Sequence, residues 1–203
     1  EAVLIEGDTV LKAGTTAEIL ASPDLSEKID CEGRTVIPGL NDSHMHLMMI
    51  GEALEQLSLE NCKSVAELIT ASKAYLAQHP EAAKKGLYGR AWNQDYFIDE
   101  KRIPNRHDLD QISTEIPVVL ERICGHILVT NTKAIEMLGL KAGSPQYKGG
   151  VFHLEEDGTP NGVFTEDACR YPLGLIQEST LDEKRMLLLK AMEYAVSRGI
   201  TSV

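Results

Sequence analysis

The sequence predicts an α/β fold in which a small β unit precedes a larger domain of alternating strands and helices. Two observations carry this prediction. Short apolar runs rich in β-branched residues alternate with longer segments whose apolar residues recur at helical spacing, which is typical of a parallel sheet covered by helices. The 203 residues, 43% of them hydrophobic and 25% charged, suffice for one sizeable globular domain with its own core.

Residues 1–37 are expected to form the β unit. Two apolar runs, 2–6 and 9–13, flank Gly7-Asp8, which favours a two-residue hairpin loop. A further short strand is expected over Arg34–Ile37. An unpaired strand edge in this unit would favour dimerisation, and the sequence does not decide whether the protein is a homodimer.

Residues 38–203 are expected to form the larger domain. Capping boxes predict the starts of two long helices, at Ser64 with Glu67 and at Thr180 with Glu183. Apolar runs predict strands near 86–92, 116–123 and 200–203, and Asn131 predicts the cap of a short helix. Residues 141–162, rich in glycine, are expected to form a hairpin that leaves the sheet.

A metal site is predicted just after Pro38-Gly39. His44 and His46 are separated by one residue, so on a strand both imidazoles would point to the same side. Imidazole is a common ligand of zinc and related divalent ions, and such a pair can hold one ion. Asp42 precedes both histidines by an even number of residues, so on a strand its carboxylate would lie on the same side. There it can accept a hydrogen bond from a ligating imidazole and fix the orientation of that ring. The alternative is a histidine hydrogen-bonded within the core.

Charge and cysteine content limit the classes of partner. A net charge of −11 argues against nucleic acid and anionic membranes, because both attract clustered Lys and Arg. No apolar run approaches the ~20 residues that span a bilayer. The four cysteines are widely spaced, with no Cys-x-x-Cys pair, which favours free thiols in a reducing cytoplasm over a zinc knuckle.

Four segments resemble the amidohydrolase superfamily. Pro38-Gly39-Leu40-Asn41-Asp42-Ser43-His44-Met45-His46 is similar to its opening metal-binding signature. Three others resemble its amidohydrolase-3 branch, which includes N-substituted formamide deformylase and exoenzyme regulatory protein: Trp92-Asn93-Gln94-Asp95, residues 117–126 with Asn131 and Ala134, and Gly162-Val163-Phe164-Thr165-Glu166. The resemblance implies that residues 38–203 are the first part of a metal-dependent (β/α)8 TIM-like barrel, with a hairpin insertion near 141–162. It also implies that residues 1–37 are part of a composite β-sandwich.

The resemblance implies a hydrolase that cleaves a C–N bond other than a peptide bond, such as an amide or formamide, in a small-molecule substrate. One or two divalent ions, with zinc as the first candidate, would lower the pKa of bound water from 15.7 to about 7 and so supply hydroxide. The family's two later histidines and its catalytic aspartate have no match here, and the residues after His46 are too few to close a barrel of ~250 residues. We therefore expect an inactive fragment of a longer enzyme; the alternative is a non-catalytic module that binds a ligand or partner.

The resemblance also assigns roles to His126 and Glu166. His126 follows an apolar strand through Gly125. The C-terminal ends of barrel strands are where active sites lie, so His126 is assigned to substrate binding or transition-state polarisation. A buried histidine behind the site is the alternative. Glu166 matches a bridging glutamate of the family and is assigned as a metal ligand with His44 and His46. An exposed acid at a helix start is the alternative.

Three residues just past the predicted strand 86–92 are assigned to the wall of the substrate pocket: Trp92, Asn93 and Asp95. Tryptophan is on average a highly buried residue, so a place for Trp92 in the core is the alternative.

Overall fold

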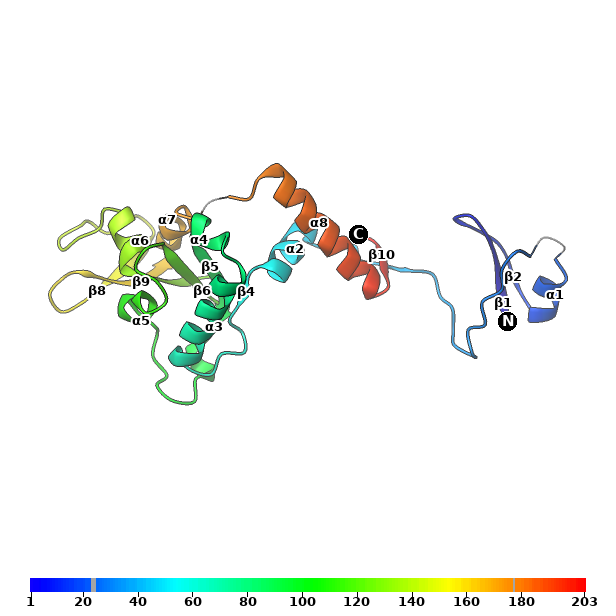
Figure 1. The fold of residues 1–203 in the computed structure, drawn as a ribbon, viewed down its shortest axis with the longest axis horizontal. Helices are drawn as coiled ribbons and strands as arrows, with labels where there is room; N and C mark the ends of the chain where they lie inside the picture. Colours follow the sequence, from blue (N-terminus) through cyan, green and yellow to red (C-terminus); the bar gives the residue numbers. More distant parts are fainter. Residues whose placement is uncertain (23–24, 177) are drawn as a thin grey trace. The chain divides into compact units, whose positions relative to one another are not determined.

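The computed structural model describes residues 1–22, 25–176 and 178–203 and divides into two compact units, 1–40 and 41–203 (Figure 1). The smaller unit contains an antiparallel pair, β1 (Ala2–Glu6) and β2 (Thr9–Gly14), and one short helix, α1 (Thr16–Leu20). The predicted hairpin is confirmed, and Gly7 adopts the positive φ of 59° that such a tight loop needs.

The predicted strand Arg34–Ile37 is wrong. Residues 34–39 have no regular secondary structure, and the side chains of Val36 and Ile37 are exposed. Among the described residues, β1 and β2 pair only with each other, and the composite β-sandwich stays a prediction. A β-branched run without a neighbouring strand has no partner for its backbone groups, which is why propensity alone was misleading here.

The larger unit contains both predicted long helices. Its first half comprises β3 (Leu40–Asn41), α2 (Leu47–Glu55), β4 (Leu57–Ser58), α3 (Val65–Gln78), α4 (Ala82–Lys85), β5 (Leu87–Trp92), η1 (Gln94–Tyr96), α5 (Arg106–Asp110), β6 (Val118–Arg122) and β7 (Ile127–Thr130). Its second half comprises α6 (Thr132–Met137), β8 (Gly150–Leu154), β9 (Pro160–Glu166), η2 (Asp167–Cys169), α7 (Arg170–Leu173), α8 (Leu181–Ser197) and β10 (Ile200–Ser202). The predicted caps Ser64, Asn131 and Thr180 are confirmed, since each side chain accepts a backbone N–H in the first turn of its helix.

A six-stranded sheet with the order β4-β5-β6-β7-β9-β8 forms the centre of this unit. The first three strands are parallel, whereas β6, β7, β9 and β8 pair antiparallel. The expected parallel layout is confirmed for β4, β5 and β6 but is wrong for β7, β9 and β8. Residues 123–126 between β6 and β7 are too few for the crossover that a parallel pair requires. The β8–β9 hairpin forms, but β9 also pairs with β7, so the hairpin belongs to the sheet instead of leaving it.

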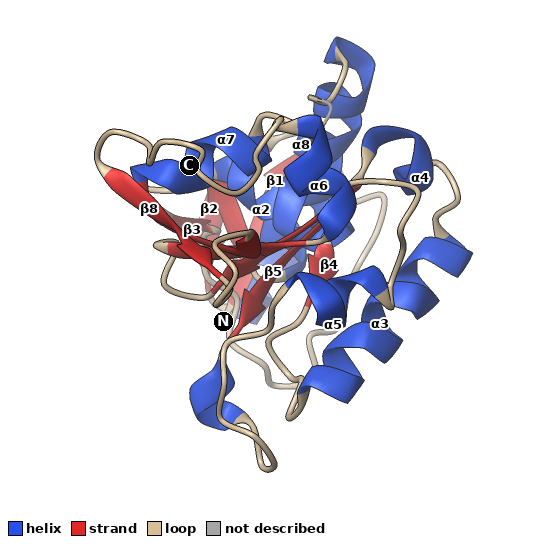
Figure 2. Cartoon of the chain, turned by 90° about the vertical axis from the view of Figure 1, so that its left-hand side faces the viewer, coloured by secondary structure: helices blue, strands red, loops and turns tan. Residues whose placement is uncertain are grey.

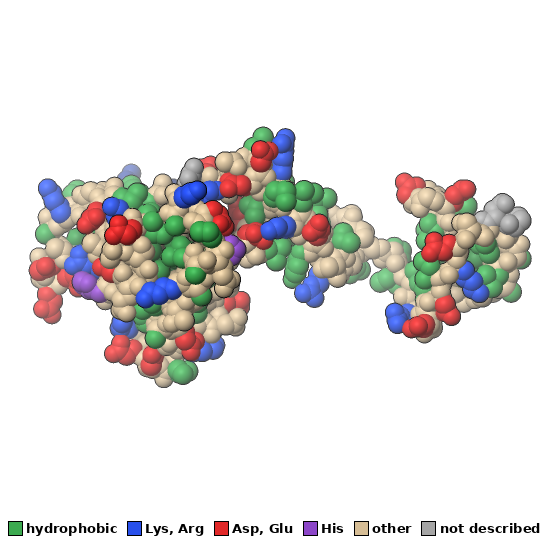
Figure 3. Space-filling view, in the orientation of Figure 1, with side chains coloured by type: hydrophobic (Ala, Val, Ile, Leu, Met, Phe, Trp, Pro, Cys, Tyr) green, Lys and Arg blue, Asp and Glu red, His purple; other side chains and the backbone are tan. Residues whose placement is uncertain are grey.

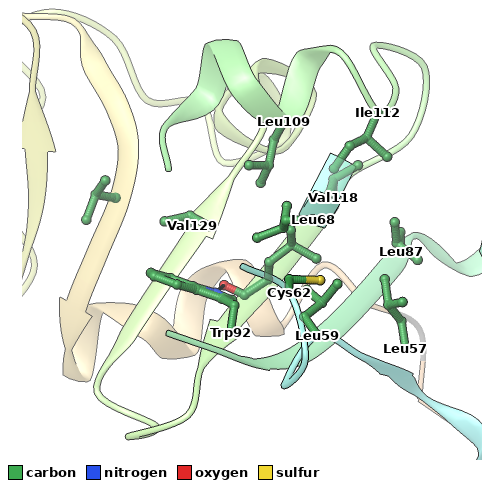
Figure 4. Packing of buried hydrophobic residues seen from close by; sticks show 12 residues of the cluster. Leu57, Leu59, Cys62, Leu68, Leu87, Trp92, Leu109, Ile112, Val118 and Val129 are labelled. Atoms are coloured by element: carbon green, nitrogen blue, oxygen red, sulfur yellow. Dashed lines mark hydrogen bonds between the residues drawn. The ribbon is translucent and has the colours of Figure 1, made fainter. Parts of the chain in front are cut away.

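Side chains alternate along the strands and cover both faces of the sheet. Helices α3 and α5 lie together beside the strands (Figure 2). One face packs against α3 and α5 and contains Leu87, Val118, Leu120, Val129 and Val163 from the strands with Leu68 and Leu109 from the helices (Figure 4). The opposite face, next to η2 and α7, contains Val119, Leu128, Phe152 and Phe164 with Ala168 and Leu173. Both faces are thus buried, which explains the nearly continuous apolar composition of β6 and β7.

A bulge in β5 decides where Trp92 points. Strict alternation from Leu87 would place Trp92 on the face opposite to Leu87. Ala91 adopts a φ of 73°, and the register with β6 shifts between Arg90 and Trp92. The extra residue restores Trp92 to the face of Leu87, where its indole joins the core (Figure 4).

The first and last elements of the larger unit lie side by side. β3 pairs with β10, and the N–H of Asp42 donates to the carbonyl oxygen of Ser202 at 3.0 Å. α2 packs on α8 so closely that a Cβ on Gly51 would lie 2.3 Å from the carbonyl oxygen of Leu187. Hydrophobic side chains remain exposed along α8 (Figure 3): Leu181, Met186, Leu189, Met192 and Val196. None of the helices in the described ranges is long and apolar enough to cross a bilayer.

Replacing Gly162 with alanine should lower the free energy of unfolding by about 3 kcal/mol. Gly162 has a φ of 91°, and a Cβ there would lie 2.4 Å from the carbonyl oxygen of Thr130. Circular dichroism during urea unfolding measures the loss. Gly158→Ala is the matched control, because its φ of 84° is similar but its Cβ would meet no atom within 4 Å. Equal losses in the two variants would show that the contact with Thr130 contributes nothing.

Candidate functional site

His44 and His46 lie in the turn between β3 and α2. β3 ends at Asn41, so the prediction that a strand carries both histidines is wrong. The backbone N–H of His44 donates instead to Oδ1 of Asp42 at 3.0 Å, an Asx turn, and His46 is the N-cap residue of α2. Asp42 therefore contacts the backbone of His44, because a short carboxylate side chain satisfies a turn amide locally.

The turn nevertheless brings the two imidazoles together. Their ring centroids lie 5.2 Å apart, with an angle of 73° between the ring planes. Both residues are exposed, so the alternative of a histidine buried in the core does not apply. Two neighbouring imidazoles open to solvent are a donor set that a divalent ion of the zinc class accepts.

The pair alone does not complete a metal site, because zinc in proteins is almost always four-coordinate. Within residues 1–22, 25–176 and 178–203, no group of three or more His, Cys, Asp or Glu side chains is placed to hold a metal ion. The structure therefore does not support the prediction that Glu166 joins His44 and His46. His44 and His46 fit as two ligands of a divalent ion, which needs further ligands to complete its coordination.

Glu166 lies beside His126. Nδ1 of His126 is 3.0 Å from Oε2 of Glu166, and the N–H of Glu166 donates to the carbonyl oxygen of His126 at 3.0 Å. They meet because β7 pairs with β9, in a register that aligns Ile127 with Thr165. As predicted, His126 follows an apolar strand, β6, which ends at Arg122; it lies in the turn that leads to the antiparallel strand β7.

The side chains of His126 and Glu166 are 68% and 61% exposed, so a buried histidine behind the site is not what the structure shows. Glu166 ends β9 and precedes η2, as in the alternative of an exposed acid at a helix start. Both residues line a shallow pocket of about 400 Å³, together with Gly125, Gly149, Asp167, Cys169, Arg170 and Leu173. The pocket is open to solvent and places the His126–Glu166 pair where a small molecule can reach it.

The two cysteines near this pocket differ in acidity. Partial burial acts to raise the pKa of the Cys124 thiol, but the N–H of His126 and the guanidinium of Arg122 hold the pKa below its usual value. The N–H of His126 lies 3.5 Å from Sγ of Cys124. Burial, with Glu121 next, raises the pKa of Cys169 to about 11. Cys124 is therefore the more readily ionised thiol.

Side chains of the segment 92–95 form hydrogen bonds with residues near the C-terminal end of β6. Trp92 is fully buried, and its Nε1–H donates to the carbonyl oxygen of Leu120 at 3.0 Å, so its prediction as a pocket wall is wrong. Oδ1 of Asn93 and Oδ2 of Asp95 accept Nη2–H groups of Arg122 at 2.8 and 2.9 Å. A substrate-binding role for Asn93 and Asp95 stays a prediction. Sequence reasoning missed Arg122; a basic residue that ends an apolar strand is the signal that points to it.

Comparisons with known proteins agree with the resemblance in sequence. The model described as "Amidohydrolase family" matches residues 27–203. The chain is 34% identical over 205 residues to Putative amidohydrolase YtcJ from Bacillus subtilis, covering 99% of the chain and 38% of the relative. It is 30% identical over 174 residues to N-substituted formamide deformylase from Arthrobacter pascens, covering 83% of the chain and 31% of the relative.

A solved structure of an uncharacterized metal-dependent hydrolase from Pyrococcus furiosus is 31% identical and superposes with a TM-score of 0.69, covering 99% of this chain and 39% of that one. The chain thus spans less than two fifths of the length of these relatives. The family model covers most of the chain, including the His44–His46 turn and the whole six-stranded sheet. The chain belongs to the amidohydrolase family.

Proposed function

We propose that the protein containing this chain is a metal-dependent hydrolase that cleaves a C–N bond other than a peptide bond, such as an amide or formamide of a small molecule. The exposed His44–His46 pair, with ring centroids 5.2 Å apart, carries this proposal. The family, the metal-dependent hydrolase from Pyrococcus furiosus and the relative named N-substituted formamide deformylase support it. The free state of all four cysteines supports a cytoplasmic location.

His44 and His46 would hold one divalent ion, with zinc as the first candidate and a second ion as an option. Such an ion supplies hydroxide at neutral pH, since it lowers the pKa of bound water to about 7. The chain itself fixes the donors: Asp42 holds the backbone of His44, and His46 is attached directly to α2. α2 is held in turn against α8 through Gly51. The backbone that carries the two imidazoles is therefore held by packed elements.

The remaining ligands are proposed to come from parts of the protein beyond the portion of its relatives that this chain spans. A non-catalytic module is the second candidate, and the incomplete ligand set among the described residues is the observation that favours it. The two candidates differ in metal content, because a binding module of this kind needs no ion at His44 and His46.

Metal content of the full-length protein tests the proposal. Elemental mass spectrometry should find at least about one zinc, manganese or iron ion per chain, and at least tenfold less in the His44→Ala/His46→Ala double variant. His107→Ala/His153→Ala is the matched control, because both of its histidines are exposed and lie outside the turn. A wild-type protein without metal, or a double variant that retains it, would contradict the proposal.

A further inference from the structure

We propose that residues 57–176 form a domain inserted between α2 and α8, which moves as one body relative to the part formed by β3, α2, α8 and β10. We call the first part the insert and the second part the base. The chain leaves the base after α2, forms the whole six-stranded sheet and returns to the base at α8. β3 pairs with β10 in a two-stranded sheet that is separate from the six-stranded one. The separation into two parts is independent of the proposed hydrolase function.

The insert has an apolar core of its own. One buried cluster packs on the α3 side of the sheet and the other on the α7 side, and every described residue of both clusters lies within 57–176. The base is held instead by the packing of α2 on α8, which buries Gly51 and Ala191 (Figure 1). A core of its own is what allows a segment to behave as a separate domain.

Two polar contacts, which we call the latch, bridge the insert and the base. Nζ of Lys85, at the end of α4, lies 2.5 Å from Oε1 of Glu183 in the first turn of α8. The O–H of Tyr75 on α3 donates to the carbonyl oxygen of Glu55, the last residue of α2, at 2.8 Å. Domains joined by polar contacts move relative to each other unless they also share a large hydrophobic interface. The latch therefore holds the two parts together without merging their cores.

A charged group also lies between α2 and β5. Burial, followed by the hydrogen bond to Glu121, raises the pKa of Tyr88 on β5, and the negative charge of Glu52 on α2 adds to the rise. Glu52 of the base is thus close enough to act on a side chain of the insert. A carboxylate at this place costs little to separate from its neighbours, because water solvates the charge when the two parts move apart.

The two parts carry different candidate residues. The turn with His44 and His46 belongs to the base, whereas the pocket lined by His126 belongs to the insert. Movement of the insert therefore changes the distance between the pocket and the turn. The effect of that movement on activity is the one consequence that rests on the proposed function.

Native-state hydrogen exchange of the full-length protein tests whether the insert and the base open separately. Trp92→Ala removes a core side chain of the insert, so backbone amides of β5, β6 and β7 should exchange at least about tenfold faster while those of α2 and α8 do not change. Gly51→Ala is the reciprocal variant, because a Cβ there would lie 2.3 Å from the carbonyl oxygen of Leu187. It should accelerate exchange in α2 and α8 and leave the sheet unchanged.

Val129→Ala in the insert and Ala191→Gly in the base repeat this comparison with milder losses, so the test does not depend on variants that fail to fold. Both residues are fully buried. Acceleration in both parts by a single variant, or in neither part, would overturn the proposal.

The distance between two spin labels in the full-length protein tests the latch. Labelled non-natural side chains replace Glu136 on α6 and Glu193 on α8, both of which are exposed, so the free cysteines stay unlabelled. Lys85→Met/Tyr75→Phe removes the latch and should change the ratio of the two distance populations by about two- to fivefold. Unchanged distances in this double variant would overturn the latch.

Arg185→Met is the matched control, because Arg185 pairs with Asp182 at 3.1 Å within α8 and bridges no other element. It should leave the distances as they are in the wild type; a change as large as that of the double variant would contradict the latch. Raising the salt concentration should shift the wild type in the direction of the double variant, since the Lys85–Glu183 pair is partly exposed. A wild type without metal bears only on the proposed function, because neither measurement depends on a metal ion.

Discussion

Replacing Trp92 with alanine should lower the free energy of unfolding of the larger unit by about 3–5 kcal/mol. The indole is fully buried in the core between the sheet, α3 and α5, where its removal leaves a cavity that packed neighbours cannot fill. The variant also leaves the carbonyl oxygen of Leu120 without the Nε1–H that it accepts at 3.0 Å. Urea unfolding measures the loss by circular dichroism, because the chain has one tryptophan and its fluorescence vanishes with it.

Tyr96→Ala is the control for the loss of an aromatic side chain in the same segment. Tyr96 is 51% exposed, so its replacement should change the free energy of unfolding by about 0.5 kcal/mol or less. If Trp92→Ala were as mild as Tyr96→Ala, the bulge at Ala91 would not direct Trp92 into the core as described.

Replacing Asn131 with aspartate should cost about 4 kcal/mol at pH 7. Asn131 is fully buried: its Oδ1 accepts the N–H groups of Val118 and Ala134, and its Nδ2 donates to the carbonyl oxygens of Ser113 and Ile116 at 2.7 and 2.8 Å. A carboxylate keeps the two acceptor contacts but turns a negative oxygen toward two carbonyl oxygens. The new aspartate should therefore have a raised pKa in the folded state.

The sign of the pH dependence follows from that raised pKa. The folded state binds the proton more tightly than the unfolded state, whose aspartate has a pKa of about 3.9. The stability of the variant relative to wild type is therefore highest below about pH 4 and falls as the pH rises through the higher folded-state pKa. Urea unfolding of both proteins across this range measures the difference.

Asn93→Asp is the matched control for Asn131→Asp. Asn93 is also buried, but its Oδ1 accepts from Asp95 N–H and from the Arg122 guanidinium, so a carboxylate faces a cation there. We expect little or no loss of stability at pH 7. A deficit in Asn131→Asp that does not grow with pH would contradict the account of Asn131 as an amide that bridges two carbonyls.

Local interactions account for the parts of the fold that the sequence predicted. Ser64, Asn131 and Thr180 cap their helices as expected, because an oxygen on a short side chain reaches a backbone N–H within the next three residues. In the first of these, Glu67 departs from the expected capping box: Oε2 accepts the N–H of Lys63, one residue before the cap. The Gly7-Asp8 hairpin was likewise predictable from its turn residues.

The proximity of His44 and His46 was also predictable, but its cause was not. The two residues are close in sequence, so either a strand or a turn brings their rings together, and the structure has the turn. The proximity of His126 and Glu166 was not predictable, because it depends on the antiparallel pairing of β7 with β9. The composition of an apolar strand does not determine which other strand it pairs with.

The sequence by itself determined the family, the helix caps, the first hairpin and the histidine pair, all of which rest on motifs or on contacts within a few residues. Tertiary structure decided the mixed sheet, the burial of Trp92 through the bulge at Ala91, and the pairing of Glu166 with His126. Strand order and register are set by which apolar faces pack together across the whole unit. That is a property of the assembled core, and no single segment carries it.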